Sequence, residues 1–187
     1  SGAILPEDSF NRCNTVKYVT LPNTIKSIGS SAFYYCTSLI EINLPESLLD
    51  IYSYAFYQCY ALNNVVLPFN LKTIGNSAFE LCTSLKQITL PITVIVGTNV
   101  FSDCTKLKYL ELVGFDKMKD YEENSDNRPW ESLKDIVEEI ALKLNAFEFK
   151  IVEENNEYVK AKFWFWNGFE FKNILESSKH QFFLRKL

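Results

Sequence analysis

Five cysteines are the most reactive side chains in this sequence, and they recur at a fixed interval. Each follows a phenylalanine by three residues, and successive copies lie 23, 23, 23 and 22 residues apart: Cys13, Cys36, Cys59, Cys82 and Cys104. An odd number of thiols raises the question of disulfides or of a metal cluster. Zinc needs four ligands that converge in a tetrahedron, whereas a column of thiols pointing the same way, with no histidine nearby, does not converge. We therefore interpret the cysteines as small apolar residues of a core, with free thiols.

Tyrosines are concentrated in one part of the chain. Six of the ten lie between residues 34 and 60: Tyr34, Tyr35, Tyr52, Tyr54, Tyr57 and Tyr60. Where the surrounding phrase recurs, these positions hold Ser, Gly, Glu or Thr, so we expect the tyrosines to face outward. Tyr34 and Tyr57 occupy the same position in successive copies, and we expect them about 5 Å apart. Such a cluster is a candidate contact site for a protein or a sugar. The alternative is ordinary surface variation with contact to a neighbouring segment.

Other residues with catalytic or metal-binding chemistry form no site. Four acids in the loop "DKMKDYEENSDN" suggest calcium, but they lack the spacing and the glycine of an EF-hand, which favours a solvated linker. The acids are Asp116, Asp120, Glu122 and Asp126. The single histidine, His180, lies near the chain end, and no paired carboxylates, nucleophile motif or phosphate loop stands out. The sequence therefore predicts a protein that is not an enzyme and that binds no cofactor and no metal.

The cysteines and tyrosines belong to a repeat of about 23 residues, which indicates a stacked array. Apolar residues recur at eight positions of each copy, and one such column is Val19, Ile42, Val65, Ile88 and Leu110. Alternation in "IEINL", "NNVVL" and "KQITL" predicts a short half-buried strand that ends at a proline. A glycine then permits a tight turn at Gly29, Gly75 and Gly97, although Tyr52 fills that place in one copy. We expect the phrase Ala-Phe-x-x-Cys to close each coil as one helical turn. Because a single copy buries too little apolar surface to offset the entropy of ordering its backbone, the copies must share a core.

The full pattern LPxxLxxIGxxAFxxCxxLxxIxLP resembles the BspA-like leucine-rich repeat. It is seen in "LPNTIKSIGSSAFYYCTSLIEINLP" and "LPFNLKTIGNSAFELCTSLKQITLP", and it covers about 110 residues in four copies with a part-repeat at the start. The resemblance implies a leucine-rich-repeat solenoid of short parallel strands plus turns. It also implies membership among surface-exposed or secreted proteins that act in adhesion and host-protein binding, without a catalytic site. The step from Pro91 to Phe101 is one residue shorter than its counterparts, so we expect the fourth repeat to pucker there.

The outward positions of the predicted strands form a second candidate surface. One column consists of Tyr18, Glu41, Asn64, Gln87 and Tyr109. Its residues are polar and mixed, without the chemistry of a pocket. They fit a broad contact surface for a partner and plain solvent exposure equally well.

Composition changes after Gly114. Charged residues number 15 of the first 115 but 27 of the last 72, which divides the chain into a repeat array, 1–115, and a C-terminal region, 116–187. In that region apolar residues spaced by three and four predict a helix from about Pro129 to Leu144. The segment also resembles the one that closes many BspA-like arrays, which implies that its apolar face covers the last repeat. The segments "AFEFKIV", "EYVKAKFWFW" and "FEFKNIL" alternate, and Asn167-Gly168 favours a tight hairpin, so we expect a three-stranded antiparallel meander. One face of that meander is a further candidate for binding.

The bulk properties narrow the classes of partner. A net charge of -4 without a basic stripe disfavours nucleic acid, and no stretch approaches about 18 consecutive apolar residues, so we expect no membrane insertion. The leading hypothesis is a binding module, on the cell surface or secreted, that recognises an extracellular-matrix or host surface protein. The alternative is a structural spacer that displays other domains and has no ligand of its own. We also expect the natural protein to continue upstream, where an export signal would lie.

Overall fold

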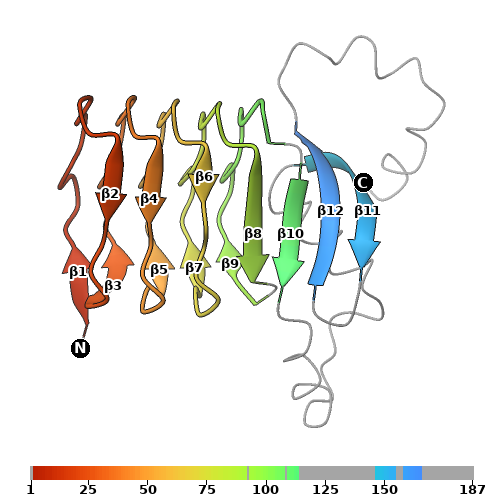
Figure 1. Ribbon diagram of the computed structural model, residues 1–187, viewed down its shortest axis with the longest axis horizontal. Helices are drawn as coiled ribbons and strands as arrows, with labels where there is room; N and C mark the ends of the chain where they lie inside the picture. Colours follow the sequence, from red (N-terminus) through yellow and green to blue (C-terminus); the bar gives the residue numbers. More distant parts are fainter. Residues whose placement is uncertain (1, 92, 108, 114–145, 155–157, 166–187) are drawn as a thin grey trace, which may run out of the picture.

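The computed structural model describes residues 2–91, 93–107, 109–113, 146–154 and 158–165, with side chains for 2–91 and 93–107. Residues 2–113 form a solenoid whose coils stack side by side from the N-terminal end (Figure 1). We number the coils by their phenylalanines, so that coils 1 to 5 contain Phe10, Phe33, Phe56, Phe79 and Phe101. The repeat period read from the sequence is therefore the period of the fold.

Each coil contributes to two parallel sheets, whose strands run in opposite directions (Figure 1). The first sheet has the order β1 (Ala3–Leu5), β3 (Ile25–Ile28), β5 (Asp50–Ile51), β7 (Thr73–Ile74), β9 (Ile95–Val96). The second begins with β2 (Tyr18–Thr20), β4 (Glu41–Asn43) and β6 (Asn64–Val65), and a single bridge from Val66 to Thr89 leads to β8 (Gln87–Pro91) and β10 (Tyr109–Val113). The strand predicted before each proline is confirmed in the second sheet. The first sheet is formed by the apolar segment that follows the proline.

Residues that pair on neighbouring strands of the first sheet are one repeat length apart in the sequence. Ile28 pairs with Ile51, Ile51 with Ile74, and Ile74 with Val96, so that one column of branched aliphatic residues runs through the first sheet. These four side chains are at most 8% exposed. Because each coil sits directly over the last, an inward-facing residue of one coil is followed by an inward-facing residue in the next, and the column is buried where coils lie on both sides.

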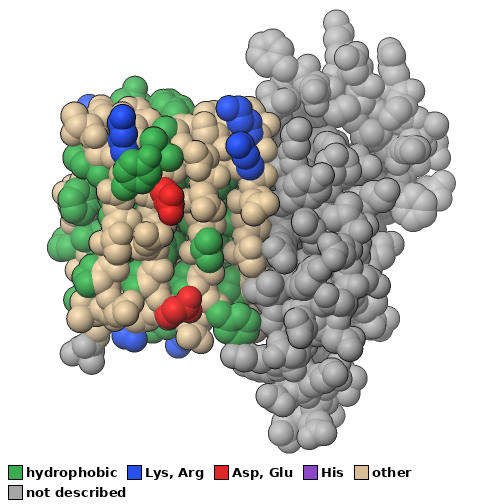
Figure 2. All heavy atoms as spheres, in the orientation of Figure 1, with side chains coloured by type: hydrophobic (Ala, Val, Ile, Leu, Met, Phe, Trp, Pro, Cys, Tyr) green, Lys and Arg blue, Asp and Glu red, His purple; other side chains and the backbone are tan. Residues whose placement is uncertain are grey.

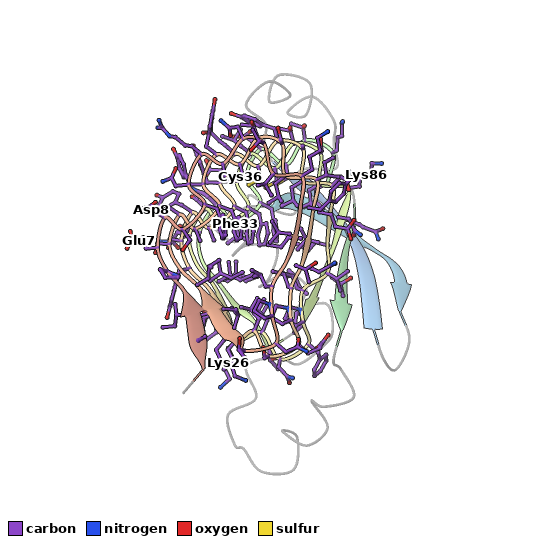
Figure 3. The ribbon with its side chains drawn as sticks, turned by 60° about the vertical axis from the view of Figure 1, so that its left-hand side comes forward. Glu7, Asp8, Lys26, Phe33, Cys36 and Lys86 are labelled. Carbon is purple, nitrogen blue, oxygen red and sulfur yellow. The ribbon has the colours of Figure 1, made fainter. Side chains whose placement is uncertain are left out.

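A ladder of phenylalanines fills the interior. Successive rings stack with centroids 5.1, 5.2 and 5.0 Å apart and planes within 9° from Phe10 to Phe79. Figure 3 shows Phe33 and Cys36 inside the coil, whereas Asp8 and Lys86 lie on the outside. The step from Phe79 to Phe101 is wider, at 5.6 Å and 20°, and it follows the repeat that is one residue short. The rings are thus spaced more widely at this step, while β7 and β9 keep a regular register; the pucker expected in the fourth repeat stays a prediction.

The Ala-Phe-x-x-Cys phrase is not a helical turn, so this expectation is wrong. Its N–H groups alternate between two kinds of acceptor: Phe33 and Tyr35 donate to Ala55 and Tyr57 in the next coil, at 2.8 Å each. Cys36 donates within its own coil to Phe33, at 3.2 Å. The residues two before and two after each phenylalanine have φ between 55° and 63°, which breaks any helix and turns the chain twice. The phrase closes the coil as two consecutive turns.

The glycines recur at one position of the repeat because neighbouring coils approach closely there. A Cβ on Gly75 would lie 2.4 Å from the backbone nitrogen of Ser53, and one on Gly29 would lie 2.5 Å from that of Glu7. The N–H of Gly75 donates to Ile51 at 2.7 Å, and Tyr52 keeps the equivalent bond to Ile28 at 3.0 Å. The glycine therefore allows the backbone to reach its hydrogen-bond partner in the preceding coil.

The C-terminal region adds two strands to the second sheet. Strands β11 (Ala146–Glu154) and β12 (Tyr158–Phe165) pair antiparallel, and β12 also pairs antiparallel with β10. The C-terminal part of the second sheet thus has the order β11-β12-β10-β8, with Leu110 opposite Ala161 (Figure 1). The predicted helix at 129–144, the Asn167-Gly168 turn and the segment "FEFKNIL" lie outside the described residues, so the capping helix and the complete meander remain predictions. In the part of the chain that the structure describes, no helix is long and apolar enough to cross a membrane.

Candidate protein-binding surface

The thiol column forms a set of hydrogen bonds between coils. Each buried thiol donates to the carbonyl of the phenylalanine in the preceding coil, with Sγ to O distances of 3.0 to 3.2 Å; the donors are Cys36, Cys59, Cys82 and Cys104. All five cysteines are free, and Cys13, at the first coil, is half-buried. Burial raises the pKa of the Cys82 thiol well above its ordinary value, because a thiolate there would lose its hydration. The buried cysteines are core residues with free thiols, as the sequence predicted, and the structure shows in addition that these thiols are hydrogen-bond donors.

The predicted tyrosine pair is present. The rings of Tyr34 and Tyr57 stack with centroids 5.1 Å apart and planes inclined by 12°, which confirms the expected spacing of one coil. Both side chains are half-buried. Stacking of this kind contributes packing beyond the area that the rings bury.

Three more tyrosines join the pair. Tyr54 meets Tyr57 edge to face at 5.7 Å, and Tyr35 meets Tyr60 edge to face at 6.1 Å. The five rings constitute what we term the tyrosine cluster: Tyr34, Tyr35, Tyr54, Tyr57 and Tyr60. The sixth predicted residue, Tyr52, is 44% exposed and occupies the position that glycine holds in coils 2, 4 and 5. Five of the six tyrosines therefore make ring contacts, in one group of three (Tyr34, Tyr54 and Tyr57) and one pair (Tyr35 and Tyr60).

The backbone fixes where these rings lie. Tyr35 and Tyr54 both adopt left-handed conformations, with φ of 58° and 59°. The N–H of Tyr35 donates to Tyr57 in the next coil at 2.8 Å, and that of Tyr54 donates to Asn76 at 3.0 Å. The ladder fixes the backbone from which the side chains project, and the ring contacts restrict the side chains themselves, so the cluster is preorganised for a partner.

Burial and nearby groups favour the neutral form of two phenols in the cluster, those of Tyr57 and Tyr60. Burial raises the pKa of the Tyr57 phenol, and the nearby Glu80 carboxylate raises it further. Burial also raises the pKa of Tyr60, with a smaller effect from Tyr35. The phenols of Tyr57 and Tyr60 therefore stay protonated and offer hydroxyl donors together with apolar ring surface.

The second candidate surface lies on the outer face of β2, β4, β6 and β8. Register aligns Tyr18 with Glu41 and Glu41 with Asn64 on successive strands, and Gln87 with Tyr109. Tyr18 is 67% exposed, Glu41 is half-buried, and the side chain of Tyr109 is outside the described set. Figure 2 shows this face with few charged side chains and with both signs present. The face is broad and polar, as the sequence indicated.

Two charged residues were not singled out from the sequence. Asp50 accepts hydrogen bonds from Ser27 at 3.2 Å and from Thr73 at 2.7 Å, and so links three coils across the first sheet. Glu80 occupies the column of Tyr34 and Tyr57 in the next coil. Both residues could have been found from their positions in the repeat, because residues 23 apart in the sequence become neighbours in the solenoid.

Comparison with known proteins finds similarity to leucine-rich-repeat proteins. The BspA-type leucine-rich-repeat model matches residues 3–122 in six copies. A leucine-rich-repeat protein of T. pallidum is 36% identical with a TM-score of 0.55, over 56% of this chain and 50% of that one. One from Bacteroides ovatus is 39% identical with a TM-score of 0.54, over 56% and 27% of the two chains.

A third solved structure carries a description of its location. It is a leucine-rich cell surface protein from Faecalibacterium prausnitzii, 26% identical with a TM-score of 0.57, over 68% of this chain and 34% of that one. The aligned part therefore spans half or less of each of these three proteins. No curated protein matches the chain.

Proposed function

Because the chain belongs to the BspA-type leucine-rich-repeat family, we propose that it is a non-catalytic protein-binding module of a cell-surface or secreted protein. Its partner is an extracellular-matrix protein or a host surface protein, and it acts in adhesion or partner recognition. The relative from Faecalibacterium prausnitzii, described as a cell surface protein, supports this location.

The observation that carries the proposal is the tyrosine cluster on coils 2 and 3. Tyrosine is enriched among the residues that dominate binding energy at protein interfaces, because it brings a large rigid surface and a polar group at low entropic cost. Five rings, three in one set of contacts and two in another, provide such a surface on neighbouring coils without reorganisation. The sheet face around Tyr18 and Asn64 is the second contact surface.

A binding assay with matched variants tests the proposal. The intact chain is passed over a panel of purified extracellular-matrix proteins, immobilised one by one, and the bound fraction is measured. One variant changes Tyr34, Tyr54 and Tyr57 to serine, and another changes Tyr18 to serine and Asn64 to alanine. Tyr52→Ser is the control, because Tyr52 is an exposed tyrosine outside the ring contacts.

Saturable binding to one matrix protein, weakened at least tenfold by the triple tyrosine change and unaffected by Tyr52→Ser, is the expected result. Binding that responds only to the sheet-face variant would move the contact to the strands. Absence of saturable binding across the panel would contradict the proposal and favour a structural spacer that displays other domains.

A further inference from the structure

The column that holds Tyr34 and Tyr57 contains a carboxylate instead of an aromatic ring one coil later. The carbonyl of Tyr57 accepts the N–H of Tyr35, and in the same way the carbonyl of Glu80 accepts the N–H of Gln58, at 2.9 Å. Glu80 is therefore the next member of the column, in coil 4. A stack of two rings ends at a carboxylate.

One face of the Tyr57 ring is directed toward that carboxylate. Tyr34, which belongs to the preceding coil, covers the other face, since the two ring planes are inclined by only 12° and their centroids are 5.1 Å apart. Tyr54 belongs to the same coil as Tyr57 and meets it edge to face, with centroids 5.7 Å apart and planes inclined by 74°, so it does not continue the stack toward coil 4. That the Glu80 carboxylate raises the pKa of the Tyr57 phenol agrees with this proximity.

Among the side chains that the structure describes, none forms an ion pair with Glu80, which is half-buried. The nearest basic residue in the following coil, Lys106, lies four positions further along its coil than the Glu80 column. Asp103 adds a second negative charge in that coil. An aromatic face beside an unpaired carboxylate is complementary to a planar cation.

We propose that Tyr57 and Glu80 form a guanidinium site, which takes an arginine side chain from an exposed segment of the protein partner. The guanidinium plane continues the ring stack over Tyr57, and its N–H groups pair with the Glu80 carboxylate. Arginine fits better than lysine because its cation is planar, stacks on rings and donates in a fork. This inference rests on the proposed function and names the chemistry that the tyrosine cluster recognises.

Peptide titration tests the site directly. The probe is acetyl-Gly-Gly-Arg-Gly-Gly-amide, and its matched controls carry lysine or citrulline in place of arginine. Citrulline keeps the shape of the side chain and removes its charge. Binding to the intact chain is followed by chemical-shift changes of the tyrosine ring protons. We expect millimolar affinity for the arginine peptide, at least threefold weaker binding of lysine, and loss of binding with citrulline.

Variants separate the two halves of the site. Glu80→Gln is expected to weaken the arginine peptide about fivefold, whereas Glu46→Gln makes the same charge change at an exposed position before β5 and is expected to have no effect. Tyr57→Phe keeps the ring face and is expected to retain binding, while Tyr57→Leu is expected to abolish it. Circular dichroism of each variant verifies the fold.

Equal effects of Glu80→Gln and Glu46→Gln, or equal binding of arginine and lysine, would overturn the site and indicate general charge attraction. Chemical shifts that respond to a neutral oligosaccharide but not to the arginine peptide would overturn it in favour of a sugar. Matrix-protein binding that survives Glu80→Gln, without any peptide binding, would contradict the guanidinium site alone and leave the proposed function standing.

Discussion

The thiol of Cys59 donates a hydrogen bond to the carbonyl of Phe33, one coil earlier, across 3.1 Å. The same relationship recurs at Cys36, Cys82 and Cys104, at nearly the same distance. The sequence pattern indicates that cysteine is a small apolar core residue, and the structure shows that its thiol is also a hydrogen-bond donor. This thiol bonds to a carbonyl at the turn where the backbone leaves its regular ladder. The cysteine column therefore stabilises the stacking of coils as well as the interior of each one.

Cys82→Ala should lower the free energy of unfolding by about 1 to 3 kcal/mol, because it removes a fully buried sulfur and leaves the Phe56 carbonyl without this donor. Urea denaturation followed by circular dichroism measures the change. Cys13→Ala is the matched control, since that thiol is half-buried at the first coil, and it should have less than half the effect. Equal losses for the two variants would contradict a role for the hydrogen bond and the burial.

Stability should fall as pH rises above about 8.5, the ordinary pKa of a thiol in an unfolded chain. Burial raises the pKa of Cys59, Cys82 and Cys104 in the folded protein, so the folded chain keeps protons that the unfolded chain releases. The free energy of unfolding then decreases with pH, by up to about 1.4 kcal/mol per pH unit for each thiol. Urea midpoints between pH 7 and pH 10 measure this slope. Cys82→Ala should make it shallower, and an unchanged slope in that variant would contradict the assignment.

Gly75→Ala should destabilise the solenoid by about 1 to 3 kcal/mol, because the added Cβ would lie 2.4 Å from the backbone nitrogen of Ser53 and would push two coils apart. Thermal unfolding measures the loss. Tyr52→Ala, at the same repeat position of coil 3, is the control, because that coil already accommodates a Cβ there. A smaller loss for Gly75→Ala than for Tyr52→Ala would show that the coils are free to separate at this point.

Much of the fold could be predicted because burial in a solenoid follows one-dimensional periodicity. The phenylalanine, cysteine and aliphatic columns were placed correctly, since a residue that repeats every 23 positions keeps one environment. Columns at the first coil are less buried than predicted: Val16 and Val19 are only partly buried, because no preceding coil covers them in the structure. Periodicity predicts which side of a coil a residue occupies, and neighbouring coils decide how far it is buried.

The turn conformation could be read from the sequence only in part. The column two residues before the phenylalanine holds Asp8, Ser31, Ser77 and Asn99 as well as Tyr54, and polar turn residues of this kind signal a left-handed conformation. The column two residues after it includes Tyr35, Gln58 and Leu81, which carry no such signal. There the hydrogen bonds to the next coil impose the conformation against local preference.

The pairing of β12 with β10 could not be predicted, because alternation indicates a strand but does not specify its neighbour. The candidate site, too, could be predicted only in part. The spacing of Tyr34 and Tyr57 followed from the period alone. The edge contacts of Tyr54 and Tyr35 depend on side-chain directions around two left-handed residues, and the pattern of residue types does not contain these directions.

Gln58→Val should destabilise the protein by about 1 to 2 kcal/mol, because Gln58 has a φ of 59° and a β-branched residue is strained in the left-handed region. Gln58→Gly should be neutral or stabilising by up to about 1 kcal/mol, since glycine adopts this conformation without strain, although it loses more entropy on folding. Urea denaturation of both variants measures the difference. Ser102→Val and Ser102→Gly provide the control pair, because Ser102 lies in the neighbouring column, where φ is not positive. Valine should there be tolerated better than glycine, and the same order of stability at both positions would show that backbone strain does not govern the turn.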